Sequence, residues 1–259
     1  MTQFLFLNPP PFLPTDISGL KGWYVGDSGT YQDASATTPA TVDDAPVGYW
    51  QDWSGQGNHV TQSTAGSRPL LRVDEQYGRN TLRFDGIAYH LRRASAFLTG
   101  SQGRIFVVWS TTAIPGSEDN LVSSASESDA THFFTYRIQG TVGQIVKTEG
   151  GSVNAIDGST VLTASRFYLS EFASTGTAYD GVVNGSTETL TAAVGSNNGD
   201  WFADVSGLAN VVIGALVRTT TTGFFSGDIA EVIIYDGVTL TAAQLASVRE
   251  YLRVRYGIF

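Results

Sequence analysis

One short segment of the 259-residue chain carries the residue types that carbohydrate recognition needs. Residues 195–202 read GSNNGDWF and include Asn197, Asn198, Asp200 and Trp201. Planar amides and carboxylates pair with neighbouring sugar hydroxyls, and an aromatic face covers the C–H side of a sugar ring. The four side chains could therefore form a glycan site from a single loop. The alternative interpretation is a polar turn whose Trp201 packs back onto the domain.

A second pair of aromatic residues, Tyr49 and Trp50, stands just before the turn sequence DWSGQGN at 52–58. If both rings are exposed, they offer another surface on which a sugar could stack. If they pack inward, they belong to the hydrophobic core. We treat Tyr49 and Trp50 as a second pair of candidate glycan-binding residues.

Catalytic and metal-binding spacings are missing from the sequence. Glu171 and Glu231 lie in expected strands, but neither has an acidic residue two positions away, which would place two carboxylates on one face of a strand. His59, His90 and His132 share no metal-ligand spacing, and there is no HExxH, Walker A or EF-hand pattern. We therefore expect a protein that is not an enzyme.

Composition excludes several classes of partner. The chain has 15 Lys and Arg against 24 Asp and Glu, a formal net charge of −9, which argues against gripping nucleic acid or an anionic membrane. It has no cysteine, so disulfides and thiolate chemistry are impossible. No stretch approaches the ~20 apolar residues of a membrane-spanning helix. The first residues, MTQFLFLN, also lack the basic and apolar regions of a signal peptide.

Residues 1–16 are expected to form an extended leader, because three successive prolines favour polyproline II and forbid a helix. Phe4, Phe6, Phe12 and Leu13 are apolar and have no partner nearby in sequence. Either these side chains lie along the domain's own surface, or they anchor the chain to a neighbouring subunit. We carry them as candidate assembly anchors.

The remainder, residues 17–259, is expected to be one all-β domain. Short apolar runs alternate with clusters of Gly, Ser, Asn and Asp, as in strands joined by tight turns. The runs RIFVVWST and IAEVIIY are apolar on both alternating faces, which is typical of central strands covered on both sides. Thr241 and Gln244 form a capping box before a helical pattern that Gly257 ends. The predicted fold is a two-sheet antiparallel jelly-roll sandwich with a short C-terminal helix.

The order of several motifs resembles the concanavalin A-like lectin/glucanase superfamily, in particular the laminin-G-like jelly rolls of phage and bacterial surface proteins. The resemblance spans roughly residues 16–257. The motifs that carry it are DISGLKGWY at 16–24, WQDWSGQGNHVTQ at 50–62, Arg68-Pro69, NTLRFDG at 80–86, RIFVVWST at 104–111, TAYDGVVNG at 177–185, NVVIG at 210–214, FFSGDIAEVIIYD at 224–236 and LTAAQ at 240–244.

The resemblance implies chemistry as well as fold. Laminarinase-like members of the superfamily carry catalytic acids as Glu-x-Asp-x-Glu on one strand, and this chain has no such triplet. Other relatives bind Ca²⁺ through loop carboxylates. A Ca²⁺ site is therefore possible here, with Asp52, Asp85 and Asp228 as the natural candidates, although no ligand can be assigned.

With the missing signal peptide and the absent cysteine, the resemblance leads us to expect a non-catalytic virion surface protein, either a phage capsid decoration protein or a tail or receptor-binding component. It would be made in the host cytoplasm, form a homo-oligomer, dock on other virion structural proteins and contact host-surface glycans. The alternatives are a bacterial carbohydrate-binding module and, less favoured by the missing acids, a glycoside hydrolase.

Overall fold

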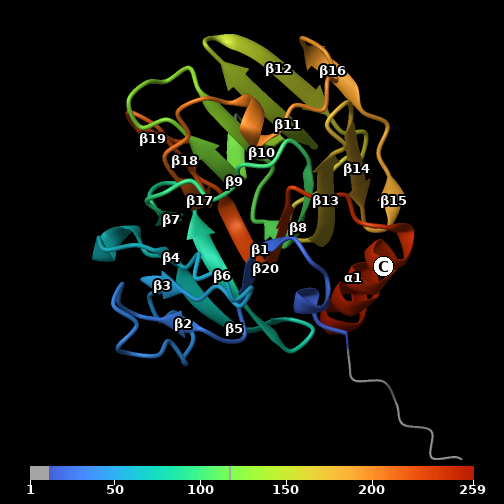
Figure 1. The fold of residues 1–259 in the computed structure, drawn as a ribbon. Coiled ribbons are helices and arrows are strands. Elements are labelled where there is room, and N and C mark those ends of the chain that lie inside the picture. Colours follow the sequence, from blue (N-terminus) through green and yellow to red (C-terminus); the bar gives the residue numbers. More distant parts are fainter. Residues whose placement is uncertain (1–11, 117) are drawn as a thin grey trace, which may run out of the picture.

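Two large antiparallel sheets pack face to face, and one helix lies on the outside of the smaller sheet (Figure 1). The computed structural model describes residues 12–116 and 118–259. The smaller sheet has eight strands in the order β15-β14-β13-β8-β20-β6-β5, and β1 also pairs with β20. Its strands are β1 (Leu20–Val25), β5 (Leu70–Gln76), β6 (Arg79–Asp85), β8 (Gly103–Thr111), β13 (Phe167–Ser174), β14 (Tyr179–Val183), β15 (Ser186–Thr187) and β20 (Ser226–Asp236).

The larger sheet has ten strands in the order β16-β12-β11-β10-β9-β17-β7-β4-β3-β2. Its strands are β2 (Thr30–Tyr31), β3 (Tyr49–Trp50), β4 (Val60–Thr61), β7 (Leu91–Arg93), β9 (Glu118–Ala125), β10 (Phe133–Gln139), β11 (Val142–Glu149), β12 (Ser152–Asp157), β16 (Thr191–Val194) and β17 (Val211–Ile213). The short elements outside the two sheets are the hairpin β18 (Leu216–Val217) and β19 (Thr221–Thr222) and the 3-10 turns η1 (Pro14–Asp16), η2 (Ala65–Ser67) and η3 (Phe202–Asp204). The predicted all-β sandwich is confirmed.

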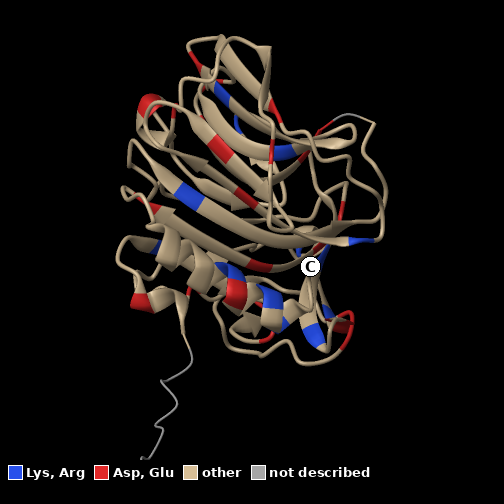
Figure 2. Cartoon of the chain, turned by 90° about the vertical axis from the view of Figure 1, so that its right-hand side faces the viewer, with Lys and Arg blue, Asp and Glu red and all other residues tan. Residues whose placement is uncertain are grey.

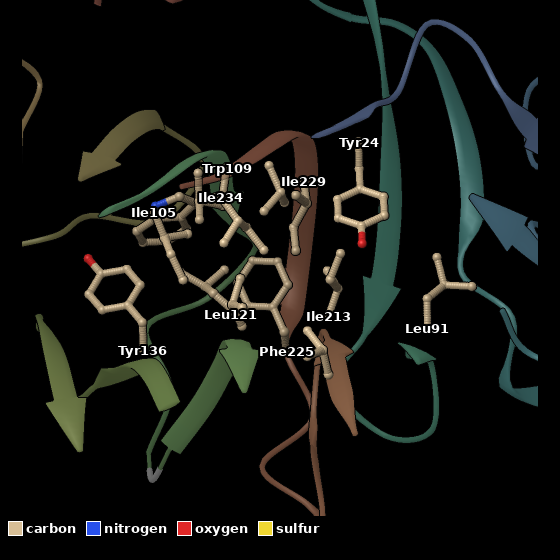
Figure 3. Close-up of a cluster of buried hydrophobic side chains, with 14 of the residues drawn as sticks. Tyr24, Leu91, Ile105, Trp109, Leu121, Tyr136, Ile213, Phe225, Ile229 and Ile234 are labelled. Atoms are coloured by element: carbon tan, nitrogen blue, oxygen red, sulfur yellow. The ribbon is translucent and has the colours of Figure 1, made fainter. Parts of the chain in front are cut away.

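The hydrophobic core lies between the two sheets, where strand alternation places every second side chain (Figure 3). Strand β8 is buried along its whole length. Ile105 and Trp109 point into the core between the sheets, whereas Phe106 and Val108 belong to a second cluster beneath the helix. This arrangement confirms that RIFVVWST is a central strand covered on both faces.

Helix α1 (Ala242–Tyr256) begins and ends as its sequence predicts. The Thr241 backbone N–H donates to Gln244 Oε1 at 2.8 Å, and the Gln244 N–H donates to Thr241 Oγ1 at 3.3 Å, which completes the capping box. Gly257 ends the helix in the left-handed region at φ 61°. Figure 2 shows α1 in front of the sheet, with charged residues on its exposed side. None of the helices in the described residues is long and apolar enough to cross a membrane.

Two buried carboxylates tie α1 to the outer face of the eight-stranded sheet. Glu171 on β13 accepts hydrogen bonds from Arg249 Nε at 2.6 Å and from Arg104 Nη1 at 3.0 Å. Glu231 on β20 lies 3.3 Å from Arg255 Nε, and burial raises the pKa of this carboxyl. Buried ionic groups of this kind need their partners, because an unpaired buried charge is strongly unfavourable.

The end of the leader packs on its own domain. Phe12 meets the ring of Tyr251 on α1 edge-on at 6.2 Å between centroids, and Tyr235 donates a hydrogen bond to the Pro14 carbonyl at 2.9 Å. Leu13 stays 43% exposed. Phe4 and Phe6 lie outside the described residues.

The outer face of the ten-stranded sheet is crossed by the segment that carries the β18–β19 hairpin, on the side opposite α1 (Figure 1). Buried polar side chains of the sheet hold this segment: Ser123 Oγ donates to the Ala215 carbonyl at 2.7 Å, and Asn120 Nδ2 donates to the Gly223 carbonyl at 2.8 Å. The crossing segment divides this face, and the strands from β7 to β2 form a separate surface on one side of it.

Candidate functional site

Trp201 is a core residue and cannot stack on a sugar. Its side chain is fully buried, and its ring lies 5.2 Å from Phe134 and 5.0 Å from Phe202. The indole Nε1 donates to Asp236 Oδ1 at 2.8 Å, so its polar atom is also satisfied inside the protein. The candidate role of Trp201 in glycan binding is therefore wrong, and the packing alternative is correct for this residue.

The three polar candidates of the same loop make hydrogen bonds within the loop and to the neighbouring strands β14 and β12. Asn197 Oδ1 accepts from the Tyr179 N–H at 2.6 Å, and Asn198 Oδ1 accepts from Ser196 Oγ at 2.7 Å. Asp200 Oδ2 accepts from Asn154 Nδ2 at 2.6 Å. Asn197 and Asn198 are exposed, but without Trp201 this loop lacks the aromatic face that the predicted site required.

Tyr49 and Trp50 point to opposite faces of the ten-stranded sheet, because neighbouring strand residues alternate. Trp50 is fully buried and its Nε1 donates to the Val25 carbonyl at 2.9 Å, so its predicted glycan contact is wrong. Tyr49 is half-buried on the outer face, with the ring of Tyr31 at 5.6 Å and that of His59 at 5.1 Å. One of the two aromatic candidates is thus available to a ligand.

Tyr49 begins a row of side chains that leads to a polar pocket. On the outer face Tyr49 pairs with Thr61 on β4, and Thr61 pairs with Arg92 on β7. Leu91, the neighbour of Arg92, is fully buried, which fixes Arg92 outward. The pocket encloses about 450 Å³. Its lining is mainly polar and consists of Thr61, Gln62, Ser63, Thr64, Ser67, His90, Arg92 and Ala94.

Arg92 supplies the charge at this pocket. Its Nη2 donates to Glu127 Oε1 at 2.8 Å, and Asn210 Nδ2 donates to the same oxygen at 3.0 Å. Both Arg92 and Glu127 keep about a third of their side chains exposed, at 31% and 35%. A guanidinium has five N–H donors, and the contact recorded for Arg92 in the described residues uses one of them. Glu127 therefore holds Arg92 in position and leaves the other N–H groups of the guanidinium available to an anion.

A hydrogen-bond network sets the protonation state of His90. Its Nδ1 lies 3.0 Å from the Ala88 carbonyl, which can only accept, so Nδ1 carries the hydrogen. The Nε2 atom then accepts from Gln62 Nε2 at 3.1 Å. Burial, opposed by the Ala88 hydrogen bond and assisted by the charge of Arg92, lowers the pKa of His90 below 6.5. The pocket therefore presents a neutral imidazole and a fixed amide at neutral pH.

The other described histidine with a shifted pKa moves in the opposite direction, which permits an internal comparison. His132 Nδ1 donates to Asp129 Oδ1 at 2.7 Å, and this hydrogen bond raises the pKa of His132 above 6.5. We expect NMR titration to find a midpoint below 6.5 for His90 and above 6.5 for His132. As the pH falls through 6.5, His90 takes up a proton in the unfolded chain before it does so in the folded protein. Protonation therefore favours the unfolded state, and the free energy of unfolding decreases. A His90 midpoint at or above that of His132 would contradict the network.

Arg68 fastens the loop that supplies several of the pocket-lining residues. Its Nε donates to the Gln62 carbonyl at 3.0 Å, its Nη2 to the Ser63 carbonyl at 2.9 Å and its Nη1 to the Gln32 carbonyl at 2.9 Å. Gln62 Oε1 in turn accepts from the Thr64 N–H at 3.0 Å. These bonds hold the hydroxyl-bearing residues of the loop in place before a ligand arrives.

The three carboxylates considered for Ca²⁺ are engaged by protein donors. Asp52 Oδ1 accepts from the Trp23 N–H at 2.9 Å, Asp85 Oδ1 accepts from three backbone N–H groups of residues 87–89, and Asp228 Oδ1 accepts from Arg83 Nε at 2.6 Å. Among the described residues, no group of three or more His, Cys, Asp and Glu is placed to hold a metal ion. The three carboxylates therefore act in turns and in an ion pair.

Sequence reasoning missed most of the pocket. Thr61 and Gln62 lie far along the chain from His90 and Arg92, and the two groups become neighbours only through the pairing of β4 with β7. Tyr49 was the one candidate site residue adjacent to them; Thr61 and Gln62 end the motif at 50–62 but were not singled out as ligand-binding, and no motif covers His90 or Arg92. The available signal was the alternation of Leu91 and Arg92, which places an arginine opposite a core leucine.

The comparisons with known proteins agree on fold. No family model matches the chain, and no curated protein matches it. Among solved structures, the CBM40 of the Ruminococcus gnavus IT-sialidase, bound to α2,3-sialyllactose, matches with a TM-score of 0.50 at 18% identity, covering 58% of this chain and 83% of that one. At this identity the match shows a shared lectin-like jelly roll.

Two sialidases give similar matches. The Trypanosoma rangeli sialidase in complex with sialic acid has a TM-score of 0.57 at 12% identity, covering 90% of this chain and 33% of that one. A NanB sialidase variant from Streptococcus pneumoniae has a TM-score of 0.51 at 12% identity, covering 64% of this chain and 27% of that one. The chain spans a third or less of these two enzymes. The fold is compatible with the concanavalin A-like superfamily suggested by the sequence.

Proposed function

We propose that this domain binds carbohydrates without turning them over, and that its ligands are glycans bearing a carboxylate. The observation that carries the proposal is the pocket between β4 and β7, where Arg92 stands among hydroxyl, amide and imidazole groups. Hydroxyls and amides pair with sugar hydroxyls, and a guanidinium pairs with a carboxylate in a planar, two-pronged geometry. Tyr49, two strands away on the same face, supplies an aromatic ring beside the pocket.

The positions of the carboxylates support the part of the proposal that excludes turnover. No Asp or Glu lines the pocket, and the adjacent Glu127 is bonded to Arg92 and Asn210. Glu171 and Glu231 lie on the outer face of the other sheet beneath α1, where arginines hold both. A glycosidase of the usual kind needs two carboxyl groups flanking one scissile bond. The similar CBM40 was solved with sialyllactose bound, and this ligand supports the choice of a carboxylated probe.

The virion role expected from the sequence resemblance stays a prediction, because neither the pocket nor the comparisons bear on it. The carbohydrate-binding alternative is the interpretation that the site favours.

The proposal is tested by closing the pocket. Ala94 is exposed and lines the pocket, so Ala94→Trp fills the pocket without disturbing the core. Ala192, exposed on the edge strand β16, gives the matched control Ala192→Trp. Isothermal titration with sialylated, uronic-acid-bearing and neutral oligosaccharides should show binding of an acidic glycan that Ala94→Trp weakens at least about tenfold, a loss of about 1.4 kcal/mol. Equal binding by the two variants, or no binding of any acidic glycan by the unmodified protein, would refute it.

A further inference from the structure

A long groove on the exposed side of α1 has no role in the proposed glycan site, which lies on the opposite face of the sandwich. It encloses about 650 Å³, a size typical of ligand sites. Its lining comes from the leader, β6 and the helix, and consists of Phe12, Arg79, Ala246, Ser247, Glu250, Tyr251, Val254 and Arg255.

A second hollow of about 230 Å³ extends the groove past Tyr251 and Arg255, which line both. This hollow is bordered by Trp23, Trp53 and Leu13. Leu13 is 43%, Trp53 40% and Val254 59% exposed, so large apolar side chains face solvent along the whole surface. Exposed apolar surface gathered in one groove marks a contact site rather than ordinary scatter.

The charged groups of this groove are paired with protein partners. Arg255 Nη2 donates to Asp27 Oδ2 at 2.6 Å, and Arg79 Nη1 lies 3.3 Å from the same oxygen. Glu250 accepts from Arg253 Nε at 2.8 Å. With the charges neutralised in pairs, the groove favours an uncharged, apolar occupant.

The chain itself contains such a segment. Residues 1–11 read MTQFLFLNPPP, with four consecutive apolar residues at 4–7 and no charged side chain. The described structure begins at Phe12, which is part of the groove wall. The groove follows α1 from Ala246 to Val254, eight residue steps or about 12 Å along a helix. Four extended residues cover about 13 Å, so the segment 4–7 matches the groove in length.

The prolines at 9–11 bear on whether residues 4–7 bind in the groove of their own copy or in the groove of a second copy. Three successive prolines favour polyproline II, which extends about 9 Å at ~3.1 Å per residue. Asn8 precedes a proline and is therefore restricted to extended conformations. Because the prolines separate residue 8 from Phe12 by about 9 Å, residues 4–7 could fill the groove of their own copy only if the chain turned back, and a four-residue turn would use up the apolar segment itself. The segment therefore reaches a neighbour more readily than its own helix.

We propose that the groove along α1 binds the Phe4–Leu7 segment of a second copy of this chain, so that copies exchange N-terminal segments. In an extended segment Phe4 and Phe6 point to the same side, and both rings can enter one groove. The proposal extends the candidate anchor role of these residues and is independent of glycan binding.

The test measures the oligomeric state of the full chain by sedimentation velocity over a range of concentrations. The segment variant is Phe4→Ser with Phe6→Ser, and the groove variant is Val254→Glu. The matched control is Val161→Glu, at a position that is 68% exposed and outside the groove. We expect the unmodified chain and the control to associate. Both test variants should raise the dissociation constant at least about tenfold, while their circular dichroism, and their melting temperature at a concentration where every chain is monomeric, stay unchanged.

Three outcomes would overturn this inference. The first is association that neither test variant weakens. The second is a monomer at all concentrations whose melting temperature falls in both variants, which would place the segment in its own groove. The third is a monomer that neither variant affects, which would show that the groove holds no part of this chain.

Discussion

Replacing Arg92 by methionine is expected to weaken binding of a carboxylated glycan by about 10- to 100-fold, while the fold remains intact. Methionine replaces most of the unbranched stem of the side chain and removes its charge and its N–H donors. A hydrogen bond to a charged group contributes about 1.5–3 kcal/mol, which corresponds to this range of affinity. Arg92 has 31% of its side chain exposed, so its loss opens no buried cavity. Isothermal titration with sialyllactose and with lactose measures the effect.

The matched control for this experiment is Arg166→Met. Arg166 is exposed and lies over the ring of Tyr168 at 5.3 Å, away from the pocket. It removes the same charge from the protein as a whole, so it corrects for long-range electrostatics. Equal affinities in the two variants would show that Arg92 makes no contact with the ligand carboxylate. Arg92→Lys should retain only part of the affinity, because an ammonium lacks the planar fork of a guanidinium.

Replacing Trp201 by alanine is expected to lower the free energy of unfolding by about 3–5 kcal/mol, the range found when a fully buried large aromatic residue is truncated. The indole fills space among Phe134, Phe172 and Phe202. The variant also leaves Asp236 Oδ1 without the donor that now lies 2.8 Å away. Chemical denaturation monitored by circular dichroism measures the loss.

The control is the exposed tryptophan, Trp53, which is 40% accessible. Trp53→Ala should cost much less than Trp201→Ala, because less of its surface is buried in the fold. If Trp201→Ala unfolded no more readily than Trp53→Ala, the core position of Trp201 would be incorrect. This pair of variants also separates a structural from a ligand-binding role for the loop at 195–202.

The tryptophans show why burial was hard to predict. For both Trp50 and Trp201 the sequence left a glycan-binding role and a core position open, and both side chains are fully buried. In the two-residue strand β3, Tyr49 and Trp50 necessarily face opposite ways, and no local pattern says which is inside. The direction is set by pairing with β4, where the partner of Trp50 is the fully buried Val60.

The strands were predictable where apolar alternation was strong and not where polar residues are satisfied by distant partners. β8 and β20 and the capped helix α1 follow from the sequence. Strand β9 reads EDNLVSSA, which resembles a loop, yet it lies at the centre of the ten-stranded sheet. Its Ser124 donates to the Asn210 carbonyl at 2.6 Å, nearly ninety residues later in the chain. Hydrogen bonds that satisfy buried polar side chains in this way depend on tertiary structure, so the sequence of the strand itself carries no sign of them.

The candidate site was predictable to the same limited degree. Tyr49 was identified as a candidate because two adjacent aromatic residues before a turn could offer a surface on which a sugar stacks. Gln62, His90 and Arg92 were not, because each reads as an ordinary polar residue in its own segment. Their function arises from strand register, which brings Thr61 opposite Arg92.

The most direct test of the account maps the ligand on the protein by NMR. The ¹⁵N-labelled full chain is titrated with sialyllactose, and shifts are followed for backbone amides, for the Gln62 side-chain amide and for the Arg92 Nε–H. The largest shifts are expected for residues 61–67, 90–94 and Tyr49, around the pocket between β4 and β7. Shifts concentrated instead in the loop at 195–202, or along the groove of α1, would contradict it.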